Sequence, residues 1–385
     1  MRVPHPRRRP AEIETLQQFD RRVSGAASLE GWVLQDLDLR GRTEVLLGRD
    51  PRGAVFLGCL LQPAAEEGLR ARGALVFPPL PDVPFDAYRA RLYSPEELYD
   101  GLADDLAPGL APELADDLAP DRSRGRYDAT LDARVHAWSR RHDDLTGHLA
   151  RTLHDLAVDD ALREVVHGRR VVGVMGGHAT SRGSQDYRDA ALLGRSLAAA
   201  GFTVATGGGP GAMEAANLGA YLAAHDEAAL DEALTVLAEV PTFTPSVDAW
   251  VSAAFDVRRR WPDGGTSLGV PTWFYGHEPP NAFAQQIAKY FKNAIREDVL
   301  LAVAHAGTVF LPGRGGTVQE VFQDACENYY AEAGAVAPMV LVGRDYWTRS
   351  LPVWPLLEAL AADRPMSGML HLVDDPAEVP ALLQR

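Results

Sequence analysis

The chain has 385 residues, of which 46% are hydrophobic and 24% are charged. This balance is typical of a folded globular protein, and it excludes wholesale disorder and a small disulfide-stapled scaffold. The 38 Lys and Arg residues stand against 53 Asp and Glu residues, a formal charge of −15. Such an acidic chain is a poor match for a protein that binds nucleic acid through its phosphates, so we expect no nucleic-acid partner.

Neither a metal site nor a membrane segment is expected. The two cysteines, Cys59 and Cys326, lie far apart and lack further ligands at zinc spacing, which favours a reducing, cytoplasmic location. The basic start MRVPHPRRRP is followed by polar residues rather than an apolar stretch, so we expect a retained tail and not a signal peptide. No stretch approaches the roughly 18 uncharged apolar residues that a membrane helix needs.

The first 125 residues predict a separate region. Short apolar runs between Trp32 and Leu61 are interrupted by Gly and Pro, which indicates a small α+β unit whose role the sequence leaves open. The stretch from Leu102 to Arg126 repeats ADDLAP and contains three prolines, a composition typical of a connector. We therefore predict one region over residues 1–125 and a second domain over 126–385.

The second domain is predicted to be a doubly wound, Rossmann-like α/β fold. Apolar residues at helical spacing between Asp128 and Val166 predict one or two leading helices. Short apolar strands then alternate with helical stretches, which predicts a parallel sheet covered by helices on both faces. The strands are expected at 170–175, 202–206, 267–275, 308–311 and 338–343, and the helices at 187–200, 281–304, 317–330 and 355–362.

The first glycine-rich motif is TGGGPGAME, which starts at Thr206 and follows a predicted strand. Gly208, Gly209 and Gly211 would let backbone amides approach a phosphate, and the next helix would direct its positive end toward it. A tight turn that binds nothing is the alternative. The spacing does not match the dinucleotide fingerprint, so a nicotinamide-dependent oxidoreductase is disfavoured, and no G-K-[ST] of a P-loop follows.

The second motif is PGRGGTVQE, from Pro312 to Glu320. Gly313, Gly315, Gly316 and the Thr317 hydroxyl would form a second phosphate cradle at the start of a helix. Glu320 would face the same cleft, where a carboxylate could stabilise a sugar cation or orient a water molecule. Its alternative role is simply to complement the helix dipole.

Together TGGGPGAMEAAN (Thr206 to Asn217) and PGRGGTVQE resemble the Lonely Guy (LOG) family, whose members are often misnamed lysine decarboxylases. The resemblance covers roughly residues 168–343. It implies a Rossmann-like fold and hydrolysis of nucleoside 5′-monophosphates to free base and ribose 5-phosphate. It also implies a dimer or higher oligomer that needs neither metal nor redox cofactor.

The resemblance further implies roles for individual residues. Glu320 matches the catalytic Glu of the family motif, and Arg296 is the candidate for its catalytic arginine, although the family's M-H-x-R-K pattern is absent. Arg314 stands where the family has Gly. Met213, within the first motif, joins the predicted binding residues, as do Gly176 and Gly177 in the first strand-to-helix turn, where a plain turn is equally possible. His178 in that turn is expected to face solvent rather than to act as an acid or base.

The working hypothesis is a cytoplasmic phosphoribohydrolase that acts on nucleoside 5′-monophosphates. The alternative is a carrier or sensor that binds a nucleotide at the same two loops without chemistry. Retention of Glu320 favours the enzyme, whereas Arg314 and the altered surroundings of Arg296 keep the carrier open.

Overall fold

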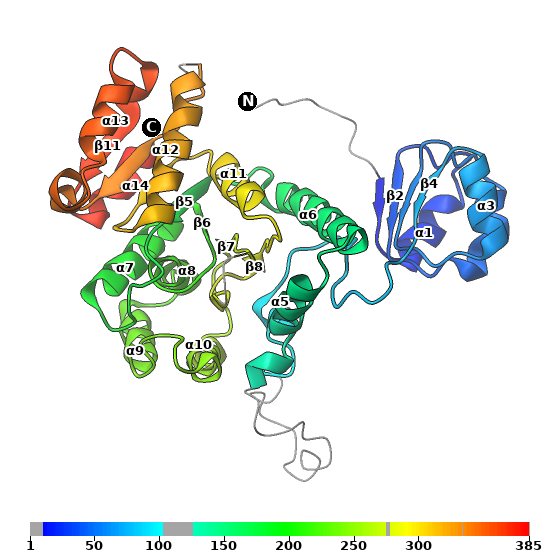
Figure 1. The fold of residues 1–385 in the computed structure, drawn as a ribbon, viewed down its shortest axis with the longest axis horizontal. Helices are drawn as coiled ribbons and strands as arrows, with labels where there is room; N and C mark the ends of the chain where they lie inside the picture. Colours follow the sequence, from blue (N-terminus) through cyan, green and yellow to red (C-terminus); the bar gives the residue numbers. More distant parts are fainter. Residues whose placement is uncertain (1–10, 103–125, 275–277, 333, 385) are drawn as a thin grey trace, which may run out of the picture. The chain divides into compact units, whose positions relative to one another are not determined.

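The computed structural model describes residues 11–102, 126–274, 278–332 and 334–384. They form two compact units, one of residues 11–91 and Arg141–Ala161, the other of Leu92–Arg140 and residues 162–384 (Figure 1). The predicted connector falls at 103–125, outside the described residues, so the domain boundary after residue 125 stays a prediction.

The first unit contains a four-stranded parallel sheet with the order β1-β2-β3-β4. Its strands are β1 (Ala11–Ile13), β2 (Trp32–Gln35), β3 (Val55–Leu57) and β4 (Leu75–Phe77). Between them run α1 (Leu16–Val23), α2 (Thr43–Leu47) and α3 (Pro63–Ala71). Ile13, Leu34, Phe56 and Val76 pair in register across the sheet, and all four side chains are buried. This ladder forms the centre of the unit's own apolar core.

The second unit contains a seven-stranded sheet with the order β11-β10-β9-β5-β6-β7-β8, in which every pairing is parallel. Its strands are β5 (Val171–Met175), β6 (Thr203–Thr206), β7 (Leu268–Gly269), β8 (Gln286–Ile287), β9 (Thr308–Phe310), β10 (Met339–Val342) and β11 (Leu370–Val373). The chain runs outward from β5 to β8, then returns to the other side of β5 with β9. This reversal places a topological switch point between β5 and β9, where doubly wound sheets bind ligands.

Helices flank the large sheet, and the predicted doubly wound, Rossmann-like fold class is confirmed. The helices of the chain from residue 92 onward are α4 (Pro95–Leu98), α5 (Leu131–Arg141), α6 (Leu145–Val166), α7 (Gln185–Ala199), α8 (Ala212–Tyr221), α9 (Glu227–Ala238), α10 (Val247–Arg260), α11 (Asn293–Val303), α12 (Gly315–Tyr330), α13 (Trp354–Ala361) and α14 (Val379–Leu383). Helices α7 and α8 pack on each other, while α11, α12 and α13 pack in succession.

Two predicted elements are wrong in extent. The strand expected at 267–275 is only the two-residue β7, and the helix expected at 281–304 begins at Asn293. At the start of that stretch the Asn281 side chain accepts hydrogen bonds from the amides of Phe283 and Ala284, both at 3.1 Å. This local turn competes with helix formation, and the chain then runs into β8 at the sheet edge.

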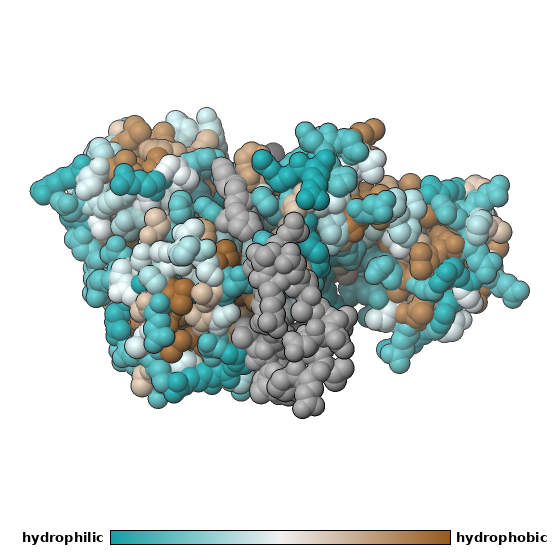
Figure 2. All heavy atoms as spheres, turned by 60° about the horizontal axis from the view of Figure 1, so that its bottom comes forward, coloured by the Kyte–Doolittle hydropathy of each residue, from teal (hydrophilic) through white to brown (hydrophobic). Residues whose placement is uncertain are grey.

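None of the helices among the described residues is both long and apolar enough to cross a membrane. Hydrophilic residues cover most of the face drawn in Figure 2, and hydrophobic residues appear there in separate patches.

Candidate functional site

Three loops meet at the carboxyl ends of β5, β6 and β9. The amide of Gly177, after β5, donates to the carbonyl of Pro312, after β9, at 3.2 Å. The amide of Ala212, after β6, donates to the carbonyl of Gly177 at 3.1 Å. Both glycine-rich motifs and the predicted turn at Gly176 and Gly177 are therefore gathered at one end of the sheet, beside its switch point.

A hydrogen-bond network of buried polar side chains fixes the first glycine loop. Thr206 donates its hydroxyl hydrogen to Oδ1 of Asn217 at 2.7 Å, and the Thr206 oxygen accepts the amide of Gly208 at 3.0 Å. The side-chain amide of Asn281 donates to Asn217 and to the carbonyl of Gly209, at 3.0 and 3.1 Å. Sequence reasoning missed Asn281, because the stretch around it was assigned to a helix.

Gly211 fits its position only because it has no side chain. Its φ is +75°, and a Cβ there would stand 2.5 Å from the carbonyl oxygen of Gly177. We expect Gly211→Ala to lower the free energy of unfolding by about 2 to 4 kcal/mol, since both the backbone strain and the clash must be relieved. Urea unfolding measures the loss. Gly315→Ala is the matched control, because a Cβ at Gly315 meets nothing within 4 Å; equal losses in the two variants would contradict the interpretation.

The second glycine loop opens α12 with an anion-binding geometry. Gly315 and Gly316 are exposed in the first turn of the helix, which contains no acidic residue. The first amides of a helix lack partners within it and direct partial positive charge outward. The loop is fixed by Tyr346, whose hydroxyl donates to the carbonyl of Gly313 at 2.6 Å, and the buried Thr317 lies directly against Gly313.

Arg314 is compatible with this loop. Its φ is −108°, so the position does not require a glycine, and the side chain is exposed. A glycine at this position is therefore not needed for the backbone conformation of this loop.

Glu320 and Arg296 come together at the same end of the sheet. Nη1 of Arg296, on α11, lies 3.1 Å from Oε1 of Glu320, on α12. Both side chains are about nine-tenths buried, at 12% and 11% exposure. A Cβ at Gly207 would stand 3.5 Å from Nη1 of Arg296 and would clash with the Met213 sulfur. The first glycine loop, Met213 and the Glu320–Arg296 pair are thus neighbours.

A second carboxylate and two amides complete this cluster. Asn293 accepts from Nη2 of Arg296 at 3.1 Å and donates to Oε1 of Glu297 at 2.7 Å. Glu297 also accepts from the side chain of Gln319 and lies 3.7 Å from Nη2 of Arg296. Sequence reasoning assigned no role to Asn293 or Glu297; their signal was only their spacing of three and one residues from Arg296.

Burial raises the pKa of Glu320 to about 7. Loss of solvation is the main cause and Glu297 adds to it, while Arg296 opposes both by favouring the carboxylate. Such a carboxyl group can hold or release a proton near neutral pH, which suits a general acid or base.

The raised pKa also predicts how stability depends on pH. Between its ordinary value of 4.5 and about 7, Glu320 is ionised in the unfolded chain but protonated in the folded one. Its contribution to stability is therefore present below pH 4.5 and is lost as the pH rises to 7, by up to about 3 kcal/mol. We expect urea unfolding of wild type to show this extra loss relative to Glu320→Gln. Glu332→Gln, at an exposed carboxyl, should show the same dependence of the free energy of unfolding on pH as wild type. If this dependence were the same for all three proteins, the raised pKa of Glu320 would be contradicted.

Two polar residues near the predicted site serve other purposes. Glu214 is fully buried and forms a two-bonded ion pair with Arg182, one bond measuring 3.0 Å. His178 is exposed, as expected, and its Nδ1 lies 3.7 Å from Oε1 of Glu278.

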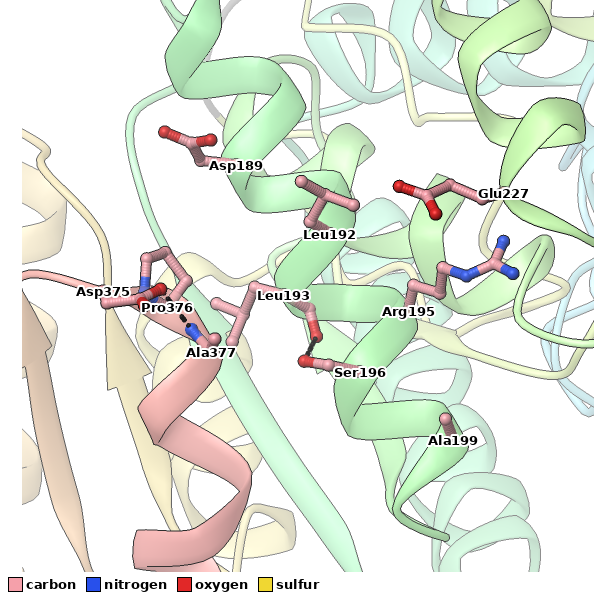
Figure 3. Close-up of a pocket in the computed structure, with 10 residues that line it drawn as sticks. All are labelled: Asp189, Leu192, Leu193, Arg195, Ser196, Ala199, Glu227, Asp375, Pro376 and Ala377. Carbon is pink, nitrogen blue, oxygen red and sulfur yellow. Dashed lines mark hydrogen bonds between the residues drawn. The ribbon is translucent and has the colours of Figure 1, made fainter.

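A different cavity, of about 430 Å³, lies between α7 and residues 375–377 (Figure 3). Several of its polar groups are bonded within the protein: Ser196 donates to the carbonyl of Leu193 at 2.9 Å, and Asp375 accepts the amide of Ala377 at 2.9 Å. Arg195 donates to the carbonyls of Leu222 and Asp226. The cavity contains neither of the glycine-rich motifs nor Glu320 and Arg296.

No group of three or more His, Cys, Asp and Glu side chains in the described part of the chain is arranged to hold a metal ion. At the start of α12, the exposed glycines Gly315 and Gly316, together with Thr317 and Arg314, could hold a negatively charged ligand.

Comparisons with known proteins give a partial match. Residues 169–225 match the model of the SLOG cluster4 family, within a superfamily that includes LOG-like proteins. No curated protein sequence matches the chain. A molybdenum cofactor binding protein from the phototrophic bacterium Rippkaea orientalis is 17% identical, with a TM-score of 0.34 over 57% of this chain and 97% of the other. A Moco carrier protein from Chlamydomonas reinhardtii is 20% identical, with a TM-score of 0.34 over 56% of this chain and 96% of the other.

At those identities and TM-scores, the two structures carry no inference about what this chain binds. The family match spans β5, α7, β6 and α8 and includes the first glycine loop; it ends before Arg296 and Glu320. From residue 169 to residue 225, this chain is similar to the SLOG cluster4 family.

Proposed function

We propose that this protein hydrolyses the N-glycosidic bond of nucleoside 5′-monophosphates, releasing free base and ribose 5-phosphate. The observation that carries the proposal is the buried Glu320–Arg296 pair, 3.1 Å apart, one helical turn inside the exposed amides that open α12. In this arrangement, a carboxyl group that can gain or lose a proton near neutral pH lies close to the start of a helix, where free backbone amides could bind a phosphate.

In the proposed reaction, the amides of Gly315, Gly316 and Thr317 hold the 5′-phosphate. The bond between ribose C1′ and the base nitrogen breaks, and its electron pair leaves with the base, which takes up a proton. The ionised Glu320 stabilises the positive charge that develops on the ribose and accepts a proton from the water that attacks C1′. Arg296 favours the ionised form of Glu320 and orients it.

The test is direct. The purified protein is incubated with a panel of purine and pyrimidine 5′-monophosphates and with the matching unphosphorylated nucleosides, and free base is followed by chromatography. We expect base from one or more monophosphates and none from the nucleosides. Saturable nucleotide binding by calorimetry without base release would instead support the carrier or sensor hypothesis.

A further inference from the structure

A second cavity borders the first glycine loop on the side away from Glu320. Its volume is about 270 Å³, and its lining includes Thr180, Arg182, Gly211, Glu214, Phe243 and Trp250. Consecutive residues of a helix point about 100° apart. On α8, Met213 faces the Arg296 side of the loop, whereas Glu214 faces this cavity. Neither Arg296 nor Glu320 lines it.

One wall of the cavity is formed by a buried ion pair, Arg182 and Glu214, whose charges neutralise each other. The side chains of Arg182 and Glu214 are both 1% exposed. Arg182 also donates to the carbonyl of Trp250 at 3.0 Å, and its guanidinium carbon lies 4.5 Å from the centre of the Trp250 ring. Because the pair neutralises itself and its donors are occupied, this wall is rigid and offers no net charge to a ligand.

Aromatic side chains form the adjoining part of the lining. The rings of Phe243 and Trp250 meet edge to face, with centres 6.3 Å apart and planes at 72°. The hydroxyl of Thr180 adds a polar group to the lining. Apolar and aromatic walls with a few hydrogen-bonding groups are typical of sites for small heterocyclic molecules, and this volume suits a ligand smaller than a complete nucleotide.

We propose that this cavity binds a neutral planar heterocycle of nucleobase size, at a site separate from the one beside Glu320. A phosphate-bearing ligand is disfavoured here, since the cation in the wall, Arg182, is fully engaged by Glu214 and by backbone carbonyls. Gly211 lines the cavity and belongs to the first glycine loop, so an occupant of the cavity would touch that loop.

The test is calorimetric titration of the full chain with adenine, hypoxanthine, cytosine and uracil, compared with the same titration of Glu320→Gln saturated with a nucleoside 5′-monophosphate. We expect at least one base to bind with a stoichiometry of one under both conditions. Thr180→Phe, which fills the cavity, and Phe243→Ala, which removes an aromatic wall, should each weaken this binding by about tenfold or more. Thr235→Phe, on the exposed face of α9, is the matched control and should bind as wild type does.

Three outcomes would overturn the proposal: no base binds, the nucleoside 5′-monophosphate displaces the base, or both cavity variants bind as tightly as wild type. Displacement would place the heterocycle in the Glu320 site instead. The titration requires no turnover, so a protein that binds base but hydrolyses no nucleotide would sink the proposed activity and leave this site intact.

Discussion

Replacing Glu320 by Gln should lower base release from nucleoside 5′-monophosphates by about a thousandfold or more. The amide keeps the size and burial of the side chain but cannot accept a proton or balance positive charge on the ribose, and a positioned acid–base group typically supplies 10² to 10⁴ in rate. Nucleotide affinity should change by less than about threefold, because the phosphate is expected to bind the backbone of α12.

Single-turnover chromatography and calorimetry on the same preparation separate the two effects. Glu332→Gln, which changes an exposed carboxyl outside the site, should turn over nucleotide at the wild-type rate. A Glu320→Gln protein with near-normal turnover would falsify the proposed mechanism.

Replacing Arg296 by Ala should reduce kcat/KM by about a hundredfold and move its pH dependence. Arg296 favours the ionised form of Glu320, so its removal raises the pKa of that carboxyl further above about 7. Since the proposed mechanism needs ionised Glu320, the rising limb of the activity profile should shift to higher pH.

If the role of Arg296 were purely structural, its removal would lower activity at every pH and would leave the rising limb of the pH–activity profile at the same pH. Arg296→Lys should keep the positive charge and therefore part of its effect on the pKa of Glu320. It should lose the two-pronged guanidinium, which donates to Asn293 and Glu320 at the same time. Arg349→Ala, at an exposed arginine that pairs with Asp345, controls for the loss of a cation and should leave the profile unchanged.

The sequence predicts the large sheet well, because its strands and helices carry clear periodic signals. The strands at β5, β6, β9 and β10 and the helices α7, α12 and α13 agree with the expected ranges to within about two residues. The exceptions are the two edges of the sheet: β11, which was not expected, and the region around β7 and β8, where strands of two residues leave little pattern. Asn281, whose side chain replaces helical hydrogen bonds, is a further exception.

For the site, the sequence predicts the residues that directly follow a strand. It misses the residues that other parts of the chain bring to the site. Both glycine motifs follow strands of the same parallel sheet, so their meeting at one edge follows from topology. Arg296 could be placed only by resemblance, and its distance to Glu320 depends on how α11 packs on α12. Asn281, Asn293 and Glu297 contact the site through side chains whose partners are up to 72 residues away, a relation that no local pattern encodes.

The four-stranded sheet of the first unit has a further consequence. Its strands begin at residues 11, 32, 55 and 75, so each turn of the chain adds one strand beside the previous one. Each strand of this stack pairs only with its nearest neighbours, as in repeat proteins. Phe56, in an interior layer, therefore supports two interfaces, whereas Val76 supports one. Whole layers of about 20 residues could be added or removed here during evolution without a change in the sheet that holds the glycine loops, as long as the last layer covers its exposed Leu75 and Phe77 edge.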